Sequence, residues 1–309
     1  AEYRNTNWFA KLFQTGVMQN HAVSLSTGSD KASYYASISV LSDPGWMKYS
    51  HSDRYTANLN ANYKLSQKVS FNVIVNGAYR QGRTPGSVDP LTGKVSSELE
   101  LNPYSYALNT SRTLDPTVAY RYRYAPMNIF EELENNYTDS HIGDIKIQGR
   151  LSWLITPKIE ATALGAIKYQ SISHELNQTE QSNIARAYRA ADNLNMIKNN
   201  EYLYEDPYDD FDVRRTVLPE GGIREKSESL LSGKDFRATL SYKDAFDEGK
   251  HKLQLLTGME TNDTYRSKDW GKNFGLMYEL GEISYFSYEA FKQIQESKSP
   301  NYYTVTRTT

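Results

Sequence analysis

The sequence contains no cysteine, which excludes disulfide bonds, thiolate metal ligands and a cysteine nucleophile within its 309 residues. It also lacks any apolar run of about 18 residues, the minimum for a membrane-spanning helix. Charge of neither sign dominates, because 35 lysines and arginines face 37 aspartates and glutamates, a net charge of -2. We therefore expect no nucleic-acid partner. A spanning β-barrel remains open, because alternating strands average out on a hydropathy scale.

Catalytic signatures are missing as well. The chain shows no nucleophile elbow, paired-histidine zinc motif or glycine-rich phosphate loop, and no acid/base pair of carboxylates stands out. The five histidines lie too far apart for metal-ligand spacing. We expect no enzyme, cofactor or metal site, and a hydrolase is the weakest of the alternatives. The histidines are His21, His51, His141, His174 and His251.

What the sequence has in abundance is tyrosine, with 25 tyrosines against 10 phenylalanines. Tyrosine suits places where a ring is apolar and its hydroxyl is wet, such as a membrane interface or a sugar-binding surface.

Strict alternation of apolar and polar residues is the main structural signal. In "RYTANLNANYKL" (54–65), Tyr55, Leu59 and Tyr63 fall on one face of a strand, and asparagines fall on the other. The same pattern recurs often enough to predict about eight strands. The predicted strands are 21–28, 32–40, 54–65, 69–80, 144–155, 158–170, 235–243 and 251–262.

The connections between these strands alternate between short and long. The short ones are 28–31, 66–68, 156–157 and 244–250, and long excursions follow 82, 171 and 269. This rhythm is typical of an outer-membrane barrel with tight periplasmic turns and long extracellular loops. Helical spacing predicts short helices within the loops. The expected helices are 127–136, 183–198 and 287–298.

The alternation also assigns faces. On the barrel interpretation the apolar row contacts lipid, and aromatic residues near strand ends form girdles, as they do in membrane barrels. The girdle candidates are Tyr55, Tyr63, Tyr79, Trp153, Tyr169 and Tyr242. The polar row is expected to face a lumen filled by water or by protein. Its asparagines are Asn58, Asn60, Asn62, Asn72 and Asn76.

One stretch carries a family resemblance. The segment "NTNWFAKLFQTGVMQNHAVSLSTGSDK", followed by the "RYTANLN" strand, resembles SusC-like TonB-dependent transporters of the Bacteroidetes outer membrane. Residues 5–65 carry it, and beyond them only the rhythm and loop lengths agree. The matching single residues are Asn5, Trp8, Phe9, Phe13, Thr15, Gln19 and Asn20.

The resemblance implies import of oligosaccharides or peptides, driven by a TonB complex and assisted by a SusD-like surface lipoprotein, in the cell outer membrane. The family's plug domain and TonB box have no counterpart in these residues. We therefore expect residues 1–309 to be a partial antiparallel transmembrane β-barrel of about eight strands, without a plug, belonging to a longer wall of about 22 strands.

The long connections hold the candidates for substrate binding. In "YRYRY", Tyr120, Tyr122 and Tyr124 would share one face of a strand and Arg121 and Arg123 the other, so rings could stack on sugars and guanidinium groups bind hydroxyls. A hairpin stem packed on neighbouring loops is the alternative. Trp46 and Trp270 are expected in outer loops, as stacking platforms or as packing anchors.

The densest acidic run, "EDPYDDFD" (205–212), leaves calcium binding open, although a solvated loop is the simpler interpretation. A different class of protein also fits the alternation, namely a soluble all-β carbohydrate-binding or adhesin module built as a sandwich. The two alternatives differ in what covers the apolar face: lipid in a barrel, or a second sheet in a sandwich.

Overall fold

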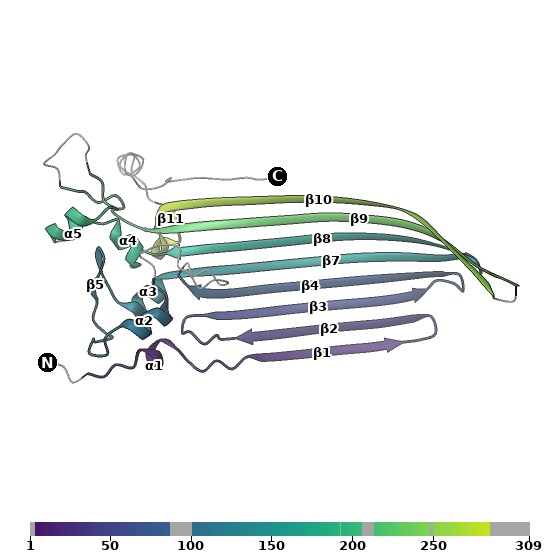
Figure 1. The fold of residues 1–309 in the computed structure, drawn as a ribbon, viewed down its shortest axis with the longest axis horizontal. Helices are drawn as coiled ribbons and strands as arrows, with labels where there is room; N and C mark the ends of the chain where they lie inside the picture. Colours follow the sequence, from purple (N-terminus) through teal and green to yellow (C-terminus); the bar gives the residue numbers. More distant parts are fainter. Residues whose placement is uncertain (1–3, 87–100, 192, 206–212, 248–249, 285–309) are drawn as a thin grey trace.

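The chain folds into one long antiparallel sheet with helices and loops gathered at one end (Figure 1). The structure, a computed structural model, describes residues 4–86, 101–191, 193–205, 213–247 and 250–284. Within this part the sheet has nine strands in the order β1-β2-β3-β4-β7-β8-β9-β10-β11. They are β1 (Gln19–Gly28), β2 (Ala32–Asp43), β3 (His51–Lys64), β4 (Val69–Pro85), β7 (Asn136–Thr156), β8 (Ile159–Gln178), β9 (Gly222–Phe246), β10 (His251–Met277) and β11 (Ile283–Ser284).

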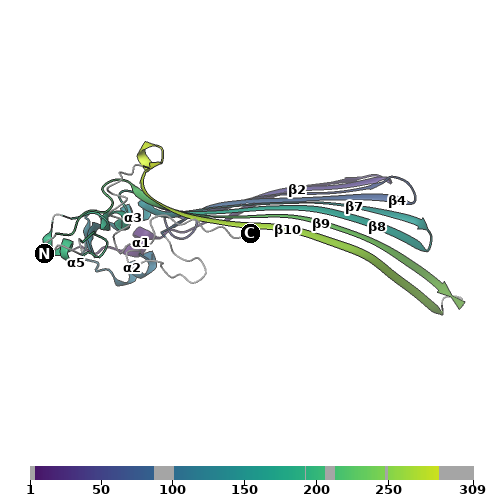
Figure 2. The same cartoon turned by 90° about the horizontal axis from the view of Figure 1, so that it is seen from above.

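All eight predicted strands are present, and the all-β class is confirmed. β1 and β11 end the sheet, so the described residues form an open wall, which Figure 2 shows to be curved. The one other sheet in the described part is the hairpin of β5 (Tyr120–Tyr122) and β6 (Ala125–Met127). No second layer of comparable size lies over the wall there, which contradicts the sandwich alternative.

Register keeps the two faces separate. Leu59 of β3 lies opposite Ala36 and Val75, and Val75 lies opposite Ile147. We call the face that carries Leu59 the apolar face and the one that carries Asn60 the polar face. Because each partner strand alternates in phase, apolar residues meet across every ladder from β1 to β8. These apolar side chains are largely exposed, as Leu25 is at 65%.

Aromatic residues form an inclined line across the apolar face. The row of partners through Tyr34 runs Ala61, Val73, Gly149, Gly165 and Phe236. Along the later strands the aromatic residues lie farther from this row, toward the short turns. On β9, five ladders away from Tyr34, Tyr242 lies six residues beyond Phe236, the member of the row. At about 3.3 Å per residue and about 4.8 Å per strand, the line is inclined by about 40° to the row. Its members are Tyr34, Tyr63, Phe71, Trp153 and Tyr242.

The strands are longer than the alternation predicts, mainly at the end that carries the loops. The prediction for β9 covers 235–243, yet the strand begins at Gly222, and β10 continues to Met277 rather than ending at 262. Most residues of both prolongations are polar, and their apolar residues do not alternate regularly, so apolar alternation cannot reveal them. With 27 residues, β10 is about 90 Å long.

In the described residues the α-helices lie before β1 or in the connections between strands, and each begins at a polar cap. The side chains of Asn7, Asn102, Asn128, Ser182 and Asn193 accept hydrogen bonds from the first turns. These helices are α1 (Trp8–Leu12), α2 (Pro103–Asn109), α3 (Ile129–Asn135), α4 (Asn183–Ala187) and α5 (Leu194–Asn199), followed by the 3-10 turn η2 (Tyr278–Leu280).

Two of the helix predictions can be compared with the structure. α3 confirms the helix expected at 127–136. The single helix expected at 183–198 is wrong: α4 ends at Ala187, and Asn193 caps a separate helix, α5. The helix expected at 287–298 lies outside the described residues.

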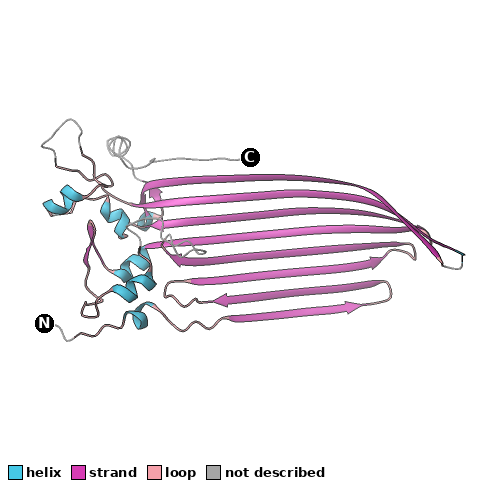
Figure 3. Ribbon diagram, in the orientation of Figure 1, coloured by secondary structure: helices cyan, strands magenta, loops and turns pink. Residues whose placement is uncertain are grey.

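The two clusters of buried apolar residues lie at the loop-bearing end of the wall, where Figure 3 shows the helices gathered, and not along the middle of the sheet. One cluster gathers α4, three residues of the connection that follows α5 (Tyr204, Val217 and Leu218) and the loop ends of β9 and β10 around Tyr188, Ile223 and Phe274. The other packs α1, α2 and α3 around Trp8, Leu12 and Ile129. The connections are therefore folded layers at one end of the wall.

Candidate functional site

Four aromatic rings form a cluster on the loop-bearing end of the wall. Phe13 stacks on Trp46 with centroids 4.8 Å apart and planes 12° from parallel, and Phe9 stacks on Phe13 at 5.6 Å. Tyr104 of α2 contacts the other three edge-on. We call Phe9, Phe13, Trp46 and Tyr104 the aromatic cluster. Trp46 remains 56% exposed and Tyr104 47%, so the cluster has rings available for stacking on a ligand.

The loop that carries Trp46 is held rigidly against the segment after α1. Gln14 N donates to Trp46 O at 2.9 Å, and Lys48 N donates to Leu12 O at 3.0 Å. Gly45 has φ +69°, a conformation that favours glycine, and its N donates to Asp43 Oδ1. These contacts fix an exposed indole in place, and a preorganised ring loses little freedom when it binds.

Sequence reasoning found Trp46 and placed it correctly in a loop, but it missed its three ring partners. Phe9 and Phe13 are four residues apart, which is a recognisable spacing on a helix. Tyr104 comes from a distant connection, and no local pattern brings it to Trp46.

The "YRYRY" stretch folds as the hairpin alternative and not as one continuous strand. β5 ends at Tyr122, and Arg123 turns the chain with a positive φ of 55°. Tyr120 Oη accepts a hydrogen bond from Asp115 N at 2.7 Å. Tyr124 packs edge-on against Tyr202 at 5.8 Å. Tyr120 and Tyr124 therefore both have structural contacts within the loop layers.

Trp270 corrects a second expectation, because it lies within β10 and not in an outer loop. Its Nε1 donates to Glu225 Oε1 on β9 at 2.8 Å. This bond fixes the indole across the ladder, as expected of a packing anchor.

The five asparagines predicted to face the lumen share the polar face. Asn72 Nδ2 lies 2.8 Å from both Asn60 Oδ1 and Asn62 Oδ1, and Asn58 Nδ2 lies 3.3 Å from Ser37 Oγ. Asn76 lies directly opposite Asn58. The bonds of Asn72 and Asn58 cross ladders, and such cross-strand pairs contribute roughly 0.2–1 kcal/mol each to a sheet.

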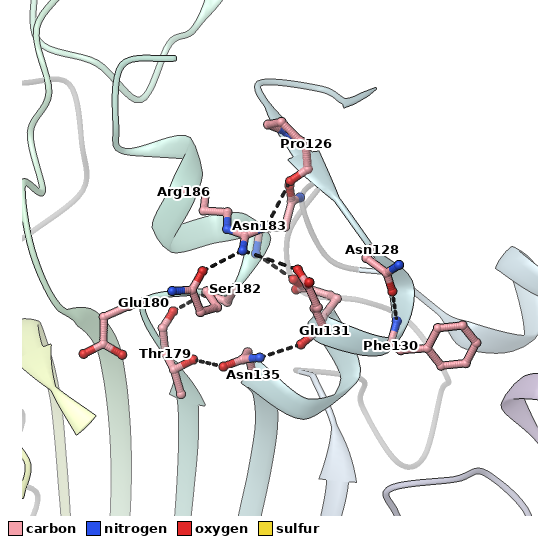
Figure 4. A network of polar contacts seen from close by, with 12 residues as sticks. Pro126, Asn128, Phe130, Glu131, Asn135, Thr179, Glu180, Ser182, Asn183 and Arg186 are labelled. Carbon is pink, nitrogen blue, oxygen red and sulfur yellow. Dashed lines mark hydrogen bonds and ion pairs between the residues drawn. The ribbon is translucent and has the colours of Figure 1, made fainter. Parts of the chain in front are cut away.

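A polar network joins α3 to the start of α4 (Figure 4). Arg186 forms an ion pair with Glu131 at 3.3 Å, and Thr179 Oγ1 donates to Asn135 Oδ1. Glu132, 4% exposed, accepts from Asn183 N at 2.6 Å and from Asn136 Nδ2 at 2.8 Å. Because a buried carboxylate is costly without donors, these bonds fix α4 on α3.

Two titratable groups near this network are perturbed by burial. Burial is the main cause that raises the pKa of Tyr278, whose Oη lies 3.1 Å from Asn177 Oδ1 and 3.0 Å from Ile223 O. Burial also lowers the pKa of Arg189, whose guanidinium donates to backbone carbonyls of residues 180, 218 and 221. Both groups tie connections to one another, and neither faces a catalytic partner.

Among the described residues, no group of three or more histidines or carboxylates is arranged to hold a metal ion. Residues 206–212 of the acidic run lie outside the described part, and Glu205 forms an ion pair with Arg214 at 2.7 Å. No helix in the described part is long and apolar enough to cross a membrane.

Known proteins resemble this chain in sequence and in fold, although no family model matches it. It is 24% identical over 211 residues to the TonB-dependent receptor SusC of Bacteroides thetaiotaomicron, a match that covers 61% of this chain and 20% of SusC. The RagAB peptide transporter matches 99% of the chain with a TM-score of 0.65 at 19% identity. RagAB in its open-open state matches 97% with a TM-score of 0.64 at 18% identity.

The chain thus spans about a fifth of the length of SusC and about 30% of the matched RagAB chain. These relatives are named as a receptor and a transporter and not as enzymes, in agreement with the expectation that the chain is not an enzyme. In sequence and in fold, the chain is similar to a portion of a SusC-like TonB-dependent transporter.

Proposed function

We propose that the chain forms part of the wall of an outer-membrane transporter, with the apolar face against lipid and the polar face toward a lumen. The observation that carries this proposal is the register, which joins apolar residues of the eight strands from β1 to β10 into one exposed face. Exposed apolar area of this extent is unfavourable in water at roughly 25 cal/mol per Å² but suits hydrocarbon.

The inclined aromatic line supports the same proposal. Strands of membrane barrels tilt by about 35–45°, and aromatic girdles mark the two interfaces. If the line marks one interface, the strands are tilted by about 40°. The tilt also explains why two charged residues, Lys234 and Asp263, lie on the apolar face in the same row as Leu59. On their own strands they lie near the loop-bearing end of the apolar positions.

The transported substrate is proposed to be an oligosaccharide or a peptide, taken up with a TonB complex and a SusD-like lipoprotein. The name of SusC supports the TonB requirement, and the RagAB structures concern a peptide transporter. The aromatic cluster is our first choice for ligand contact, since Trp46 stays exposed. Tyr120, Arg121, Tyr122, Arg123, Tyr124 and Trp270 remain weaker candidates.

This proposal is tested by finding on which side of the membrane the short turns and the long connections lie. The chain has no cysteine, so one introduced cysteine can be labelled specifically, provided that the rest of the transporter is also free of reactive thiols. One variant replaces Asp30 in a short turn by cysteine, and a second replaces Arg112 beside α2. On intact cells a membrane-impermeant maleimide should label position 112, and position 30 only after permeabilisation. Labelling of both on intact cells contradicts a spanning wall, and the reverse pattern inverts the topology.

A further inference from the structure

One row of ladder partners on the polar face carries positive charge at both ends and apolar side chains in its middle. The row crosses six neighbouring strands, from β3 to β10, toward the loop-bearing end of the wall. We call it the mouth row. Its members, in strand order, are Arg54, Arg80, Ile142, Ile172, Ser229 and Lys268.

The mouth row lies just beyond a second line of tyrosines on the apolar face. It is one residue from Tyr55 and Tyr79 and three residues from Tyr169 and Tyr265, always toward the loops. In membrane barrels, aromatic residues mark the interface between hydrocarbon and water. The row therefore faces the entrance of the lumen on the loop-bearing side, where an arriving solute meets the wall first.

The chain does not neutralise the two charged ends of this row. Arg54 and Arg80 are direct partners, and Arg266 lies two residues from Lys268 on the same face. All four side chains are exposed, and within the described residues none of them forms an ion pair. Like charges directly opposite each other destabilise a sheet, so a bound anion would offset this repulsion.

Acidic residues at the same level lie mainly on the other face of the wall. The adjacent row toward the loops, on the apolar face, has three carboxylates and no lysine or arginine among its described residues. Near the mouth row itself, Asp43 and Glu225 accept hydrogen bonds within the chain. Asp144 remains, one carboxylate against four cations. The three acids on the apolar face are Asp53, Glu228 and Asp269.

The dimensions of the mouth row indicate what it can bind. Four ladders separate Arg80 from Lys268, about 19 Å at about 4.8 Å per strand, so one small anion cannot reach both ends. An extended peptide covers this distance with about six residues. Between the ends, Ile142 and Ile172 are half-buried direct partners, and the row contains no aromatic ring. Its middle therefore suits aliphatic side chains better than sugar rings, which stack on aromatic faces.

We propose that the mouth row binds a peptide with acidic residues at both ends of a short apolar stretch. The inference assigns a substrate class to the transporter and rests on the proposed wall function. At one end carboxylates contact Arg54 and Arg80, and guanidinium groups can bind them through paired hydrogen bonds. At the other end they contact Arg266 and Lys268.

The test measures how labelled peptides bind to the whole transporter, by fluorescence anisotropy. The acidic probe is an octapeptide with two aspartates at each end and Ala-Leu-Leu-Ala between them. The neutral probe has asparagines in place of the aspartates. Because each exposed ion pair changes an affinity by up to about fivefold, we expect the acidic probe to bind at least about tenfold tighter. Salt at about 1 M shortens the screening length to about 3 Å and should remove this difference.

Variants locate the binding to the mouth row. R80Q/K268Q removes one cation from each end and should weaken the acidic probe about tenfold, with the neutral probe unchanged. I142S/I172S should weaken both probes severalfold. The matched control is K146Q/K168Q, an opposed pair on the same face about 13 Å nearer the short turns, beyond the screening length of about 10 Å at 0.1 M. It should change binding less than about twofold.

Equal affinities for the two probes, or equal losses in R80Q/K268Q and in the control, would overturn the proposal. Tighter binding of tetragalacturonate than of the acidic probe would overturn it in favour of an acidic oligosaccharide. If a variant fails to fold, the two probes on the unchanged chain still decide. Cysteine labelling at positions 30 and 112 is independent of peptide binding, so the expected labelling without a preference for the acidic probe rejects this inference and keeps the wall.

Discussion

Single residues bind the loop layers together, and Glu132 is the clearest case. Its carboxylate accepts hydrogen bonds from Asn183 N and from Asn136 Nδ2. Glu132→Gln turns an amide NH₂ toward one of them and removes the charge. We expect a loss of about 1.5–3 kcal/mol in the local stability of α4. Hydrogen exchange of a peptide covering 179–188 measures it.

Glu131→Gln is the matched control for that change. Glu131 also contacts α4, through Arg186, but its side chain is 53% exposed and water screens the pair. We expect a change of at most about 1 kcal/mol. Equal effects at both positions would mean that burial of the Glu132 carboxylate is not what holds α4.

Tyr278 predicts a pH dependence of the same region. Its pKa is raised in the folded state, so the stability it contributes is complete below the ordinary value of 10.0 and falls as pH rises beyond it. Tyr278→Phe loses the hydroxyl contacts and should cost about 0.5–1.5 kcal/mol at neutral pH. The variant should also lose stability less steeply above pH 10. Hydrogen exchange at pH 8 and pH 11, corrected for intrinsic rates, checks both effects.

At the scale of the element, the strand faces decide what each position tolerates. Leu59 and Val73 lie on the apolar face and Asn60 and Asn72 on the polar face. Leu59→Arg should lower stability in the membrane by roughly 2–4 kcal/mol, the cost of arginine at the bilayer midplane. Asn60→Arg, one residue away, should be tolerated far better. Denaturant unfolding from vesicles measures the difference, and equal losses would contradict the assignment of faces.

Some of these strands and helices can be predicted from the sequence, and others cannot. Strands with one apolar face, such as 54–65 and 69–80, are predictable because apolar and polar residues alternate along them. In "REKSESLLSGK" (224–234) most residues on both faces are polar, so the start of β9 could not be seen. The turn at Arg123, the break after Ala187 and the rings around Trp46 depend on tertiary contacts, which no local pattern encodes.

At the scale of the whole molecule, the wall should not be stable alone in water. Large apolar side chains stay exposed along it, and each forgoes about 1.5–3 kcal/mol of burial. In addition, β1 leaves one edge unpaired in the described sheet, a template for aggregation. Residues 1–309 expressed without detergent should not be a monodisperse monomer. Light scattering and circular dichroism check this, and a soluble monomer with a cooperative melt would contradict it.

We propose that one face of the wall meets lipid and the other meets water. Spin labels placed singly at positions 59, 60, 72 and 73 of the whole transporter in its membrane test it most directly. Oxygen concentrates in lipid, whereas a charged nickel chelate stays in water. We predict that labels at 59 and 73 relax mainly with oxygen and labels at 60 and 72 mainly with the chelate. Preference for the chelate at 59 and 73 would contradict the account.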